Sequence, residues 1–307
     1  MVVHRLLAVS RNRLGKKHKS SAHRHPWITI LVAACLSAFP FALPLLAQTA
    51  DGASEPACKP GEAPAPAKAL GFTRAAITLC PKLADISTSG LGTAALYNGH
   101  QWQKPIPAPS LYTSSPDGGL RMIAGGTLCS VSHDMQAGTL PLLDGSRGFY
   151  VEFTTRLSDD DPDHFPAVWL MPVEHNAAQH DHYDPDPKGY ERYLELDVDE
   201  GGFTKGFMGT AIAWEGIWPH YQRTRSNPIW AVPPLDRSKT HTFAALFDPT
   251  DLRVSWFLDG KLQYTATGPA VPRISLQQHF YLILEANQHD KKIPYYMDVL
   301  DIRAFTP

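Results

Sequence analysis

The sequence predicts an all-β fold, a jelly-roll sandwich of two packed antiparallel sheets. Short runs that alternate apolar and polar residues, such as GFYVEFTTRL (148–157), have the period of a half-buried strand. In LRVSWFLDGKLQYTAT (252–267), Asp259-Gly260 separates two such runs and predicts a hairpin, because this dipeptide tolerates the positive φ of a tight turn. Long helical periodicity is missing, and 22 Gly and 27 Pro punctuate the chain. These features are typical of a sandwich.

Six further segments have the same strand-like pattern. They are LRMIA (120–124), FPAVWLM (165–171), FMGTAIAW (207–214), HTFAALF (241–247), FYLILEA (280–286) and YYMDVLDIRAF (295–305). All fall within 70–307, a stretch of roughly 240 residues that one large all-β domain can fill. We therefore expect a single domain over 70–307.

The first fifty residues predict an export signal. Seven Lys and Arg with no acidic residue precede an apolar run that starts at Trp27 and ends in small residues, the order of a secretory signal with a long basic region. An uncleaved anchor is the alternative, since an apolar run of roughly 20 residues can span a bilayer. Pro40 and Pro44 favour cleavage. We expect a secreted or periplasmic protein, anchored in the membrane only if the leader is retained.

Residues 51–69, DGASEPACKPGEAPAPAKA, are rich in Pro, Ala and polar residues and predict a linker or disordered stalk. Beyond position 50, 21 Lys and Arg face 30 acidic residues, a net charge of about −9. An acidic surface does not attract polyanions, which argues against nucleic acid and heavily sulfated polysaccharide as partners. A neutral ligand fits this charge better.

Cysteine is sparse in this chain. Cys35 lies in the leader, which leaves Cys58, Cys80 and Cys129, an odd number for an oxidising compartment. These cysteines allow one disulfide, either Cys58–Cys80 or Cys80–Cys129, and the sequence does not choose between them. No CxxC pair indicates a zinc site or a thiol redox centre.

The segment YLELDVDEGG (193–202) carries an unusual charge for a buried strand. Its apolar residues alternate, yet Glu195, Asp197, Asp199 and Glu200 occupy the remaining positions. In a flat strand the first three acids share one face and Glu200 points into the core. Burying a carboxylate without a partner is costly. Some departure from the flat strand is therefore expected.

A β-bulge at Val198 or Asp199 resolves the conflict. One extra residue resets the alternation and returns Glu200 to the face of Glu195 and Asp197. Three acids then line one concave surface, as retaining glycoside hydrolysis needs: one carboxylate attacks the anomeric carbon and one carboxylic acid protonates the leaving oxygen. We predict Glu195 as nucleophile, Glu200 as acid/base and Asp197 as the helper that couples their titrations.

The motif E-x-D-x-x-E over 195–200 resembles the signature of glycoside hydrolase family 16, endo-β-glucanases and relatives with a concanavalin-like jelly roll. The flanking strands are similar in type and order: PAVWLMP (166–172), HTFAALFDPTDLRVSWFLDGKL (241–262), FYLILEAN (280–287) and YYMDVLDIRAF (295–305). The resemblance covers about 85–305. It implies the same roles for the three acids, a cleft tryptophan at Trp169 and endo-cleavage of a neutral 1,3- or mixed-linkage β-glucan. No cofactor is implied, although Asp298 resembles the family's structural calcium ligand.

The chain also departs from the family pattern. The bulge residue is usually apolar there, whereas this chain has Asp199; alignment to the unbulged variant would instead select Glu195, Asp197 and Asp199. Glu285 stands where Asn or another neutral residue is expected, and the strand after the motif lacks the usual histidine. Two alternatives follow: an inactive, lectin-like carbohydrate-binding module, or a transglycosylase that uses the same acids.

Aromatic residues predict where sugar rings bind, because an aromatic face covers the apolar face of a pyranose. The candidate platforms are Trp169, Trp214, Trp218 and Trp230, and Tyr193 is a candidate hydrogen-bonding partner for a sugar hydroxyl. Trp256, in the hairpin, is expected in the core. The His- and Asp-rich stretch 173–192 lacks the spacing of a metal site and predicts a solvated loop. We expect a monomer that acts on polysaccharide.

Overall fold

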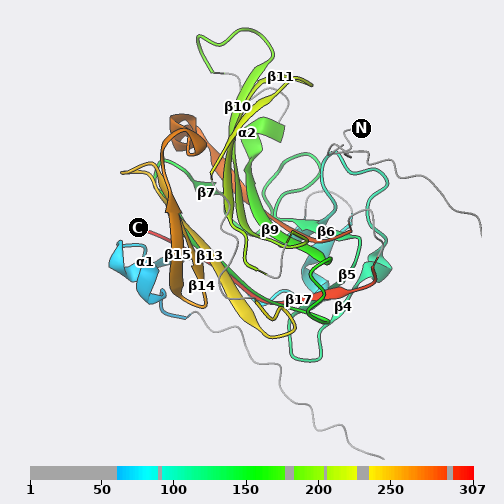
Figure 1. Cartoon of the computed structure of the whole chain (residues 1–307). Coiled ribbons are helices and arrows are strands. Elements are labelled where there is room, and N and C mark those ends of the chain that lie inside the picture. The colour runs from blue at the N-terminus through cyan, green and yellow to red at the C-terminus, as the bar shows by residue number, and fades with distance from the viewer. Residues whose placement is uncertain (1–60, 89–91, 177–182, 204–205, 227–234, 289–292) are drawn as a thin grey trace, which may run out of the picture. The chain divides into compact units, whose positions relative to one another are not determined.

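The computed structural model describes residues 61–88, 92–176, 183–203, 206–226, 235–288 and 293–307 (Figure 1). The chain divides into two units, Met1–Ser54 and Glu55–Pro307. The leader predicted for 1–50 lies outside the described residues, as does Trp230. In the part that is described, no helix is long and apolar enough to cross a membrane.

Two sheets form the described part of the chain, and the predicted sandwich is confirmed. The nine-stranded sheet runs in the order β12 (Gln222–Arg225), β11 (Thr210–Ile217), β10 (Tyr190–Glu200), β9 (Phe165–Pro172), β16 (His279–Asn287), β6 (Gly126–Cys129), β3 (Leu96–Asn98) and β2 (Ile86–Ser87), with β7 (Leu143–Asp144) also paired to β16. The eight-stranded sheet runs in the order β15 (Lys261–Ala266), β14 (Arg253–Leu258), β13 (His241–Asp248), β8 (Phe149–Leu157), β17 (Tyr296–Thr306), β5 (Leu120–Ile123) and β4 (Tyr112–Ser114), with β1 (Arg74–Leu79) paired to β17. All these pairs are antiparallel except β2 with β3.

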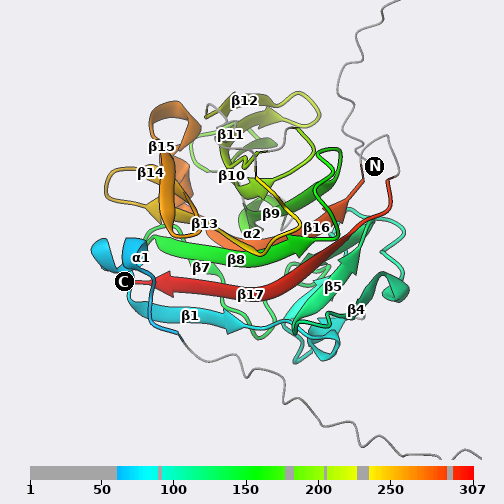
Figure 2. The ribbon, with the colours of Figure 1, turned by 60° about the horizontal axis from the view of Figure 1, so that its bottom comes forward.

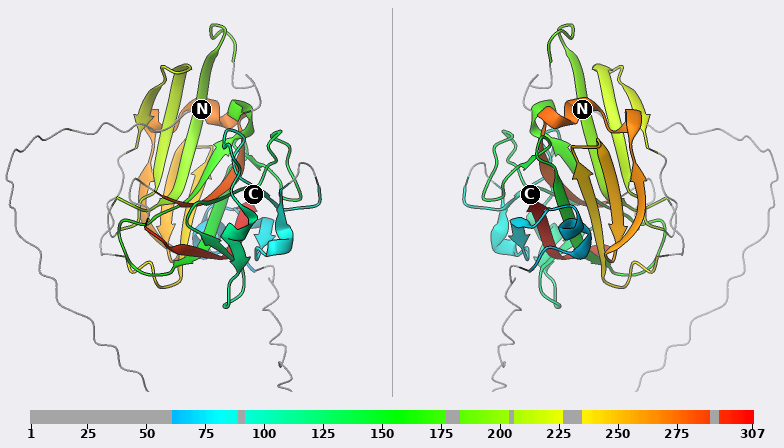
Figure 3. Two further views of the ribbon diagram at one scale, coloured as in Figure 1. Left: turned by 90° about the vertical axis from the view of Figure 1, so that its right-hand side faces the viewer. Right: turned by 90° about the vertical axis from the view of Figure 1, so that its left-hand side faces the viewer.

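Figure 2 shows β1, β17 and β8 side by side in the eight-stranded sheet, and Figure 3 shows β10 and β11 together in the other layer. Helical elements are short and lie in the connections: α1 (Ala65–Ala69), α2 (Val173–Asn176), η1 (Leu83–Asp85), η2 (Pro109–Leu111), η3 (Gly268–Ala270) and η4 (Arg273–Gln277). The predicted hairpin is confirmed, because β14 and β15 flank Asp259 and Gly260, whose φ angles of 49° and 73° are both positive.

The core lies between the two sheets. The alternate residues Leu194, Leu196 and Val198 of β10 join one buried cluster with apolar residues of β8, β13 and β14. Trp256 of β14 is fully buried, as predicted, and its Nε1 donates a hydrogen bond of 2.7 Å to the backbone carbonyl of Asp197. The eight-stranded sheet therefore supports the acidic strand from behind.

Gly209, just before β11, allows Trp256 to reach that position. A Cβ atom at Gly209 would lie 2.1 Å from Cδ1 of the Trp256 indole. Because the hydrogen bond to Asp197 holds the indole in place, we expect Gly209→Ala to lower the free energy of unfolding by about 1–3 kcal/mol. Urea denaturation measures this loss. The matched control is Gly92→Ala, where the nearest atom is 4.0 Å away; equal losses in the two variants would contradict the explanation.

Two expectations are corrected at the N-terminal end of the domain. The predicted linker 51–69 is wrong over its last residues, because 65–69 form α1 and Ala67 is buried against Phe72 and Phe305. Small alanine side chains allow this close packing even in a Pro-rich segment; residues 51–60 lie outside the described part. The alternative disulfide Cys80–Cys129 is also wrong, since Cys129 is a buried free thiol while Cys80 is disulfide-bonded.

Candidate active site

The acidic strand β10 contains the predicted bulge. Its register to β9 pairs Asp197 with Trp169 and then Asp199 with Val168, so one residue, Val198, is extra. Glu200 follows opposite Ala167. Paired residues share a face of an antiparallel sheet, and Ala167 lies two residues from Trp169 on the same face. The bulge therefore returns Glu200 to the face that carries Asp197.

We call this the outer face of the nine-stranded sheet, because the other face packs in the core with the eight-stranded sheet. Glu195, two residues before Asp197, also lies on it and is paired with Ile212 of β11. Glu195 and Glu200 are partly exposed, whereas Asp197 between them is buried. The predicted three acids are thus brought together on one face, with their outer two members only partly exposed.

Asp199 points the other way. Its carboxylate is buried and accepts two hydrogen bonds from Arg237, from Nη1 at 2.6 Å and from Nη2 at 2.8 Å. The unbulged alternative, in which Glu195, Asp197 and Asp199 share a face, is therefore wrong. The reason is that Arg237, 38 positions later in the sequence, pairs with the Asp199 carboxylate between the sheets.

Burial is the largest cause that raises the pKa values of all three acids, and nearby carboxylate charges add to it. Burial raises the pKa of Glu195 to about 7, against the Trp214 hydrogen bond and the arginines of β12, which lower it. Burial and the charge of Glu195 raise the pKa of Glu200 to about 8, and the same two causes hold the pKa of Asp197 well above its usual range. At neutral pH the cluster therefore holds protons as well as charge, with Glu195 ionising before Glu200.

Trp214 of β11 is the direct hydrogen-bond partner of the predicted nucleophile. Its Nε1 donates to Oε2 of Glu195 at 3.0 Å. Arg223 and Arg225 lie on β12, opposite Trp214 and Ile212, and their positive charges lower the pKa of Glu195. These groups favour the ionised form of Glu195. Trp214 was predicted only as a sugar platform, and the structure adds a direct hydrogen bond to Glu195.

A second set of groups lies on the same face toward β6. Glu285 of β16 pairs with Ala167, so it flanks that alanine opposite Glu200. His100 contacts Glu285 with Nε2 at 2.7 Å and Sγ of Cys129 with Nδ1 at 3.4 Å. Burial lowers the pKa of His100, but Cys129 and Glu285 outweigh it and raise the pKa to about 10. The unexpected charge of Glu285 is therefore balanced by a protonated histidine.

Sequence reasoning missed His100 and its neighbour Trp102. The Trp102 ring stacks on His100 with a centroid distance of 4.5 Å and is 42% exposed. Trp169 also contacts His100, with ring centroids 5.7 Å apart, and its buried Nε1 has no acceptor among the described residues. The pair His100-x-Trp102 carried no strand pattern, so only the unexplained Glu285 could have indicated that a cation lay nearby.

The other predicted aromatics form a row beyond Trp214. Tyr193 is buried, with its ring stacked between His175 and Trp214 at centroid distances of 3.7 and 6.1 Å. Its predicted bond to a sugar hydroxyl stays a prediction. Trp218 is half exposed and contacts Tyr221. Trp218 is therefore the most exposed of these predicted aromatic residues.

Asp298 does not fit the role of a calcium ligand. It is fully buried in β17, and its two oxygens accept hydrogen bonds of 2.7 and 2.9 Å from Arg121 and of 2.7 Å from Arg156. Two guanidinium groups already neutralise this carboxylate and occupy both of its oxygens, where a calcium ion would need free ones. The buried charge of Asp298 is thus accounted for by two arginines.

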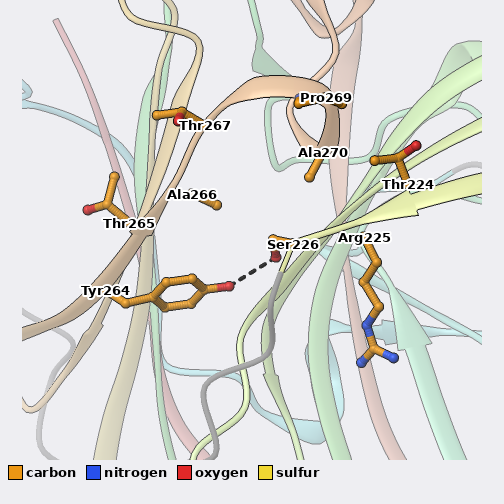
Figure 4. Close-up of a pocket in the computed structure, with 9 residues that line it drawn as sticks. All are labelled: Thr224, Arg225, Ser226, Tyr264, Thr265, Ala266, Thr267, Pro269 and Ala270. Atoms are coloured by element: carbon orange, nitrogen blue, oxygen red, sulfur yellow. Dashed lines mark hydrogen bonds between the residues drawn. The ribbon is translucent and has the colours of Figure 1, made fainter.

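A pocket of about 360 Å³ lies between the edge strands β12 and β15 (Figure 4). It is lined by Thr224, Arg225, Ser226, Tyr264, Thr265, Ala266, Thr267, Pro269 and Ala270. The Ser226 and Tyr264 hydroxyls, 2.9 Å apart, join the two edges, and Arg225 extends away from that pair. This pocket belongs to the margin of the sandwich.

Known proteins are similar to the chain only at the level of solved structures. No family model and no curated protein matches it. A laminarinase from Flavobacterium sp. UMI-01 aligns over 65% of this chain and 84% of its own, with 16% identity and a TM-score of 0.42. A GlcNAc-alpha-1,4-Gal-releasing endo-β-galactosidase from Clostridium perfringens aligns over 76% and 63%, with 12% identity and a TM-score of 0.47.

A non-specific endo-β-1,3(4)-glucanase of glycoside hydrolase family 16 aligns over 68% of this chain and 82% of its own, with 15% identity and a TM-score of 0.40. The family that the acidic motif resembles is thus found among the structures to which this chain is similar. At these identities and TM-scores, the fold and the roles of the acids rest on the geometry of this chain.

Proposed function

We propose that the protein is a retaining endo-glycosidase. One observation carries the proposal: the bulge at Val198 places Glu200 on the outer face with Glu195 and Asp197, while the remaining acid, Asp199, is neutralised inside. Two separately tuned carboxyl groups on an open face are the groups that double displacement at an anomeric carbon needs. Their pKa values of about 7 and about 8 lie at and just above neutral pH.

Each acid has a role in the reaction. Glu195, ionised first and held by the Trp214 N–H, attacks the anomeric carbon while Glu200 donates its proton to the leaving glycosidic oxygen. The glycosyl ester on Glu195 is then attacked by water, whose proton passes to Glu200 and restores both groups. Asp197, buried between them, couples their titrations. This cycle uses side chains of the chain alone.

A neutral β-glucan, 1,3- or mixed-linkage, is the proposed substrate. Residues 51–307 carry a net charge of about −9, which disfavours a polyanion. Trp169, partly exposed beside Asp197, supports sugar binding through its ring. We further propose an exported monomer, secreted or periplasmic.

The proposal is tested with purified full-length protein incubated with laminarin, lichenan and agarose. Reducing ends report hydrolysis, and affinity electrophoresis reports binding. We expect internal cleavage of laminarin or lichenan. Binding without any turnover would replace the proposal with the lectin-like alternative, and products longer than the substrate would indicate transglycosylation. If the protein neither binds nor cleaves any of the three glycans, the proposal is contradicted.

The Trp214 hydrogen bond predicts a shift in the pH profile. Trp214→Phe keeps an aromatic ring but removes the donor that lowers the pKa of Glu195. Because the nucleophile must be ionised, kcat/KM rises as pH passes the pKa of Glu195, and a higher pKa moves this limb to higher pH. The control is Trp218→Phe, on a residue without a bond to Glu195, which we expect to change KM only. An unmoved limb in Trp214→Phe would refute the assignment.

A further inference from the structure

Asp199 and Arg237 form an ion pair between the sheets that the proposed reaction does not use. Asp199 is 3% exposed and Arg237 7% exposed, and both oxygens of the carboxylate meet the guanidinium fork. Asp199 is the residue directly after the bulge and directly before Glu200. A charged pair at this position, behind the acid/base residue, calls for an explanation beyond packing.

The apolar residues of β10 do not decide how the strand ends. Leu194, Leu196 and Val198 face the core with or without the bulge. The two arrangements differ only in which of two consecutive acids turns inward: Asp199 with the bulge, Glu200 without it. Both residues are carboxylic acids, so hydrophobic burial alone gives the strand little preference.

Arg237 supplies the missing preference, because its own contacts fix it in place. Its Nη2 donates to the carbonyl of Gly206 at 2.9 Å, and its backbone N–H donates to Oδ1 of Asp160 at 3.1 Å. Its carbonyl accepts from the N–H of Leu157 at 2.8 Å, and its guanidinium lies 5.3 Å from the Phe243 ring centroid. A guanidinium is always charged, so this interior site requires a carboxylate and binds it in a fork geometry.

We propose that the Asp199–Arg237 pair locks the register of β10, holding Asp199 between the sheets and thereby Glu200 on the outer face. Both are positioning residues for Glu200, and its acid/base role rests on the function proposed above. Buried polar pairs are best attested in such register-setting roles, since they are weak sources of net stability. Without Arg237 neither acid has a partner between the sheets, and the strand returns to the unbulged register, which keeps the ladder hydrogen bonds intact but turns Asp199 outward and Glu200 inward.

The first test compares turnover in variants of the full-length protein. Arg237→Met leaves Asp199 buried without a partner, and we expect kcat to fall on the order of 10²-fold in the folded protein, the scale of a misplaced catalytic group. Asp199→Leu/Arg237→Met puts an apolar residue inward again, so kcat recovers to within a few-fold. The matched control is Arg303→Met, which strips the arginine from buried Glu152 in the eight-stranded sheet and leaves kcat unchanged.

The second test reads the register without turnover, so it decides the inference even if no glycan is cleaved. Glu200→Cys places a thiol on the outer face, where it reacts with iodoacetamide under native conditions; Cys129 is buried and Cys80 is disulfide-bonded. We expect labelling to slow at least about tenfold when Arg237→Met is added and to recover when Asp199→Leu is added as well.

Labelling and kcat that stay at the parental level in folded Arg237→Met would overturn the register lock. If that variant does not fold, Arg237→Lys decides in the same way, because lysine keeps one charge but loses the two-pronged contact. Slower labelling there supports the lock, and unchanged labelling overturns it. If only the proposed function is wrong, no variant shows turnover, but labelling of Glu200→Cys still slows when Arg237→Met is added.

Discussion

Glu195→Gln should abolish glycan turnover, with kcat lower by about 10⁴-fold or more. The substitution keeps the shape of the side chain and an oxygen that accepts the Trp214 N–H, but an amide cannot form the covalent ester. The loss should therefore reach or exceed the range typical of removing an acid/base group. Reducing-end release from laminarin or lichenan measures it, and circular dichroism verifies that the fold is intact.

The control for this variant is Glu215→Gln, the same chemical change on the neighbouring strand. Glu215 pairs with Arg192, whose side chain lies on the opposite face of β10 from Glu195. Glu215 therefore points away from the acids. We expect parental turnover in the control. Undiminished hydrolysis in Glu195→Gln would show that another group is the nucleophile.

Stability should fall as pH rises across the acidic cluster. Burial raises the pKa of Glu195 from 4.5 to about 7 and, with the charge of Glu195, that of Glu200 from 4.5 to about 8. The folded protein thus binds more protons than the unfolded chain between pH 4.5 and 8, so the free energy of unfolding decreases with pH in this window. Glu200→Gln removes one titrating group and relieves repulsion on Glu195. We expect it to gain about 1–3 kcal/mol over the parent at pH 8.

Urea denaturation at pH 5, 6, 7 and 8 tests this expectation. His100 has the same sign above pH 6.5, because its raised pKa stabilises the fold only while it is protonated. The difference between parent and Glu200→Gln isolates the acid, since both retain His100. Parallel stability curves for the two proteins would mean that Glu200 is not forced to hold a proton.

Local patterns were sufficient to predict the sandwich and the bulge. In the strand at 193–200, strict alternation would bury Glu200 with the apolar residues. One extra residue in the strand returns Glu200 to the face of the other acids. The Asp259-Gly260 turn and the core position of Trp256 follow equally local rules. Each of these features depends on residues that are close in sequence.

Contacts between distant residues could not be predicted. Asp199 looked like a fourth acid of the site, and only the folded chain brings Arg237 to it. The same holds for Glu285 and His100, which are 185 positions apart, and for Asp298, whose two arginine partners come from other strands. A single sequence shows where an acidic residue lies in the chain but not which distant residue neutralises its charge.

The stereochemistry of cleavage tests the account most directly. Proton NMR during the first minutes of laminarin or lichenan hydrolysis resolves the anomer that is released before mutarotation. Double displacement by Glu195 and Glu200 predicts that the β-anomer appears first. The α-anomer appearing first would contradict it, because a single displacement uses no covalent ester on Glu195.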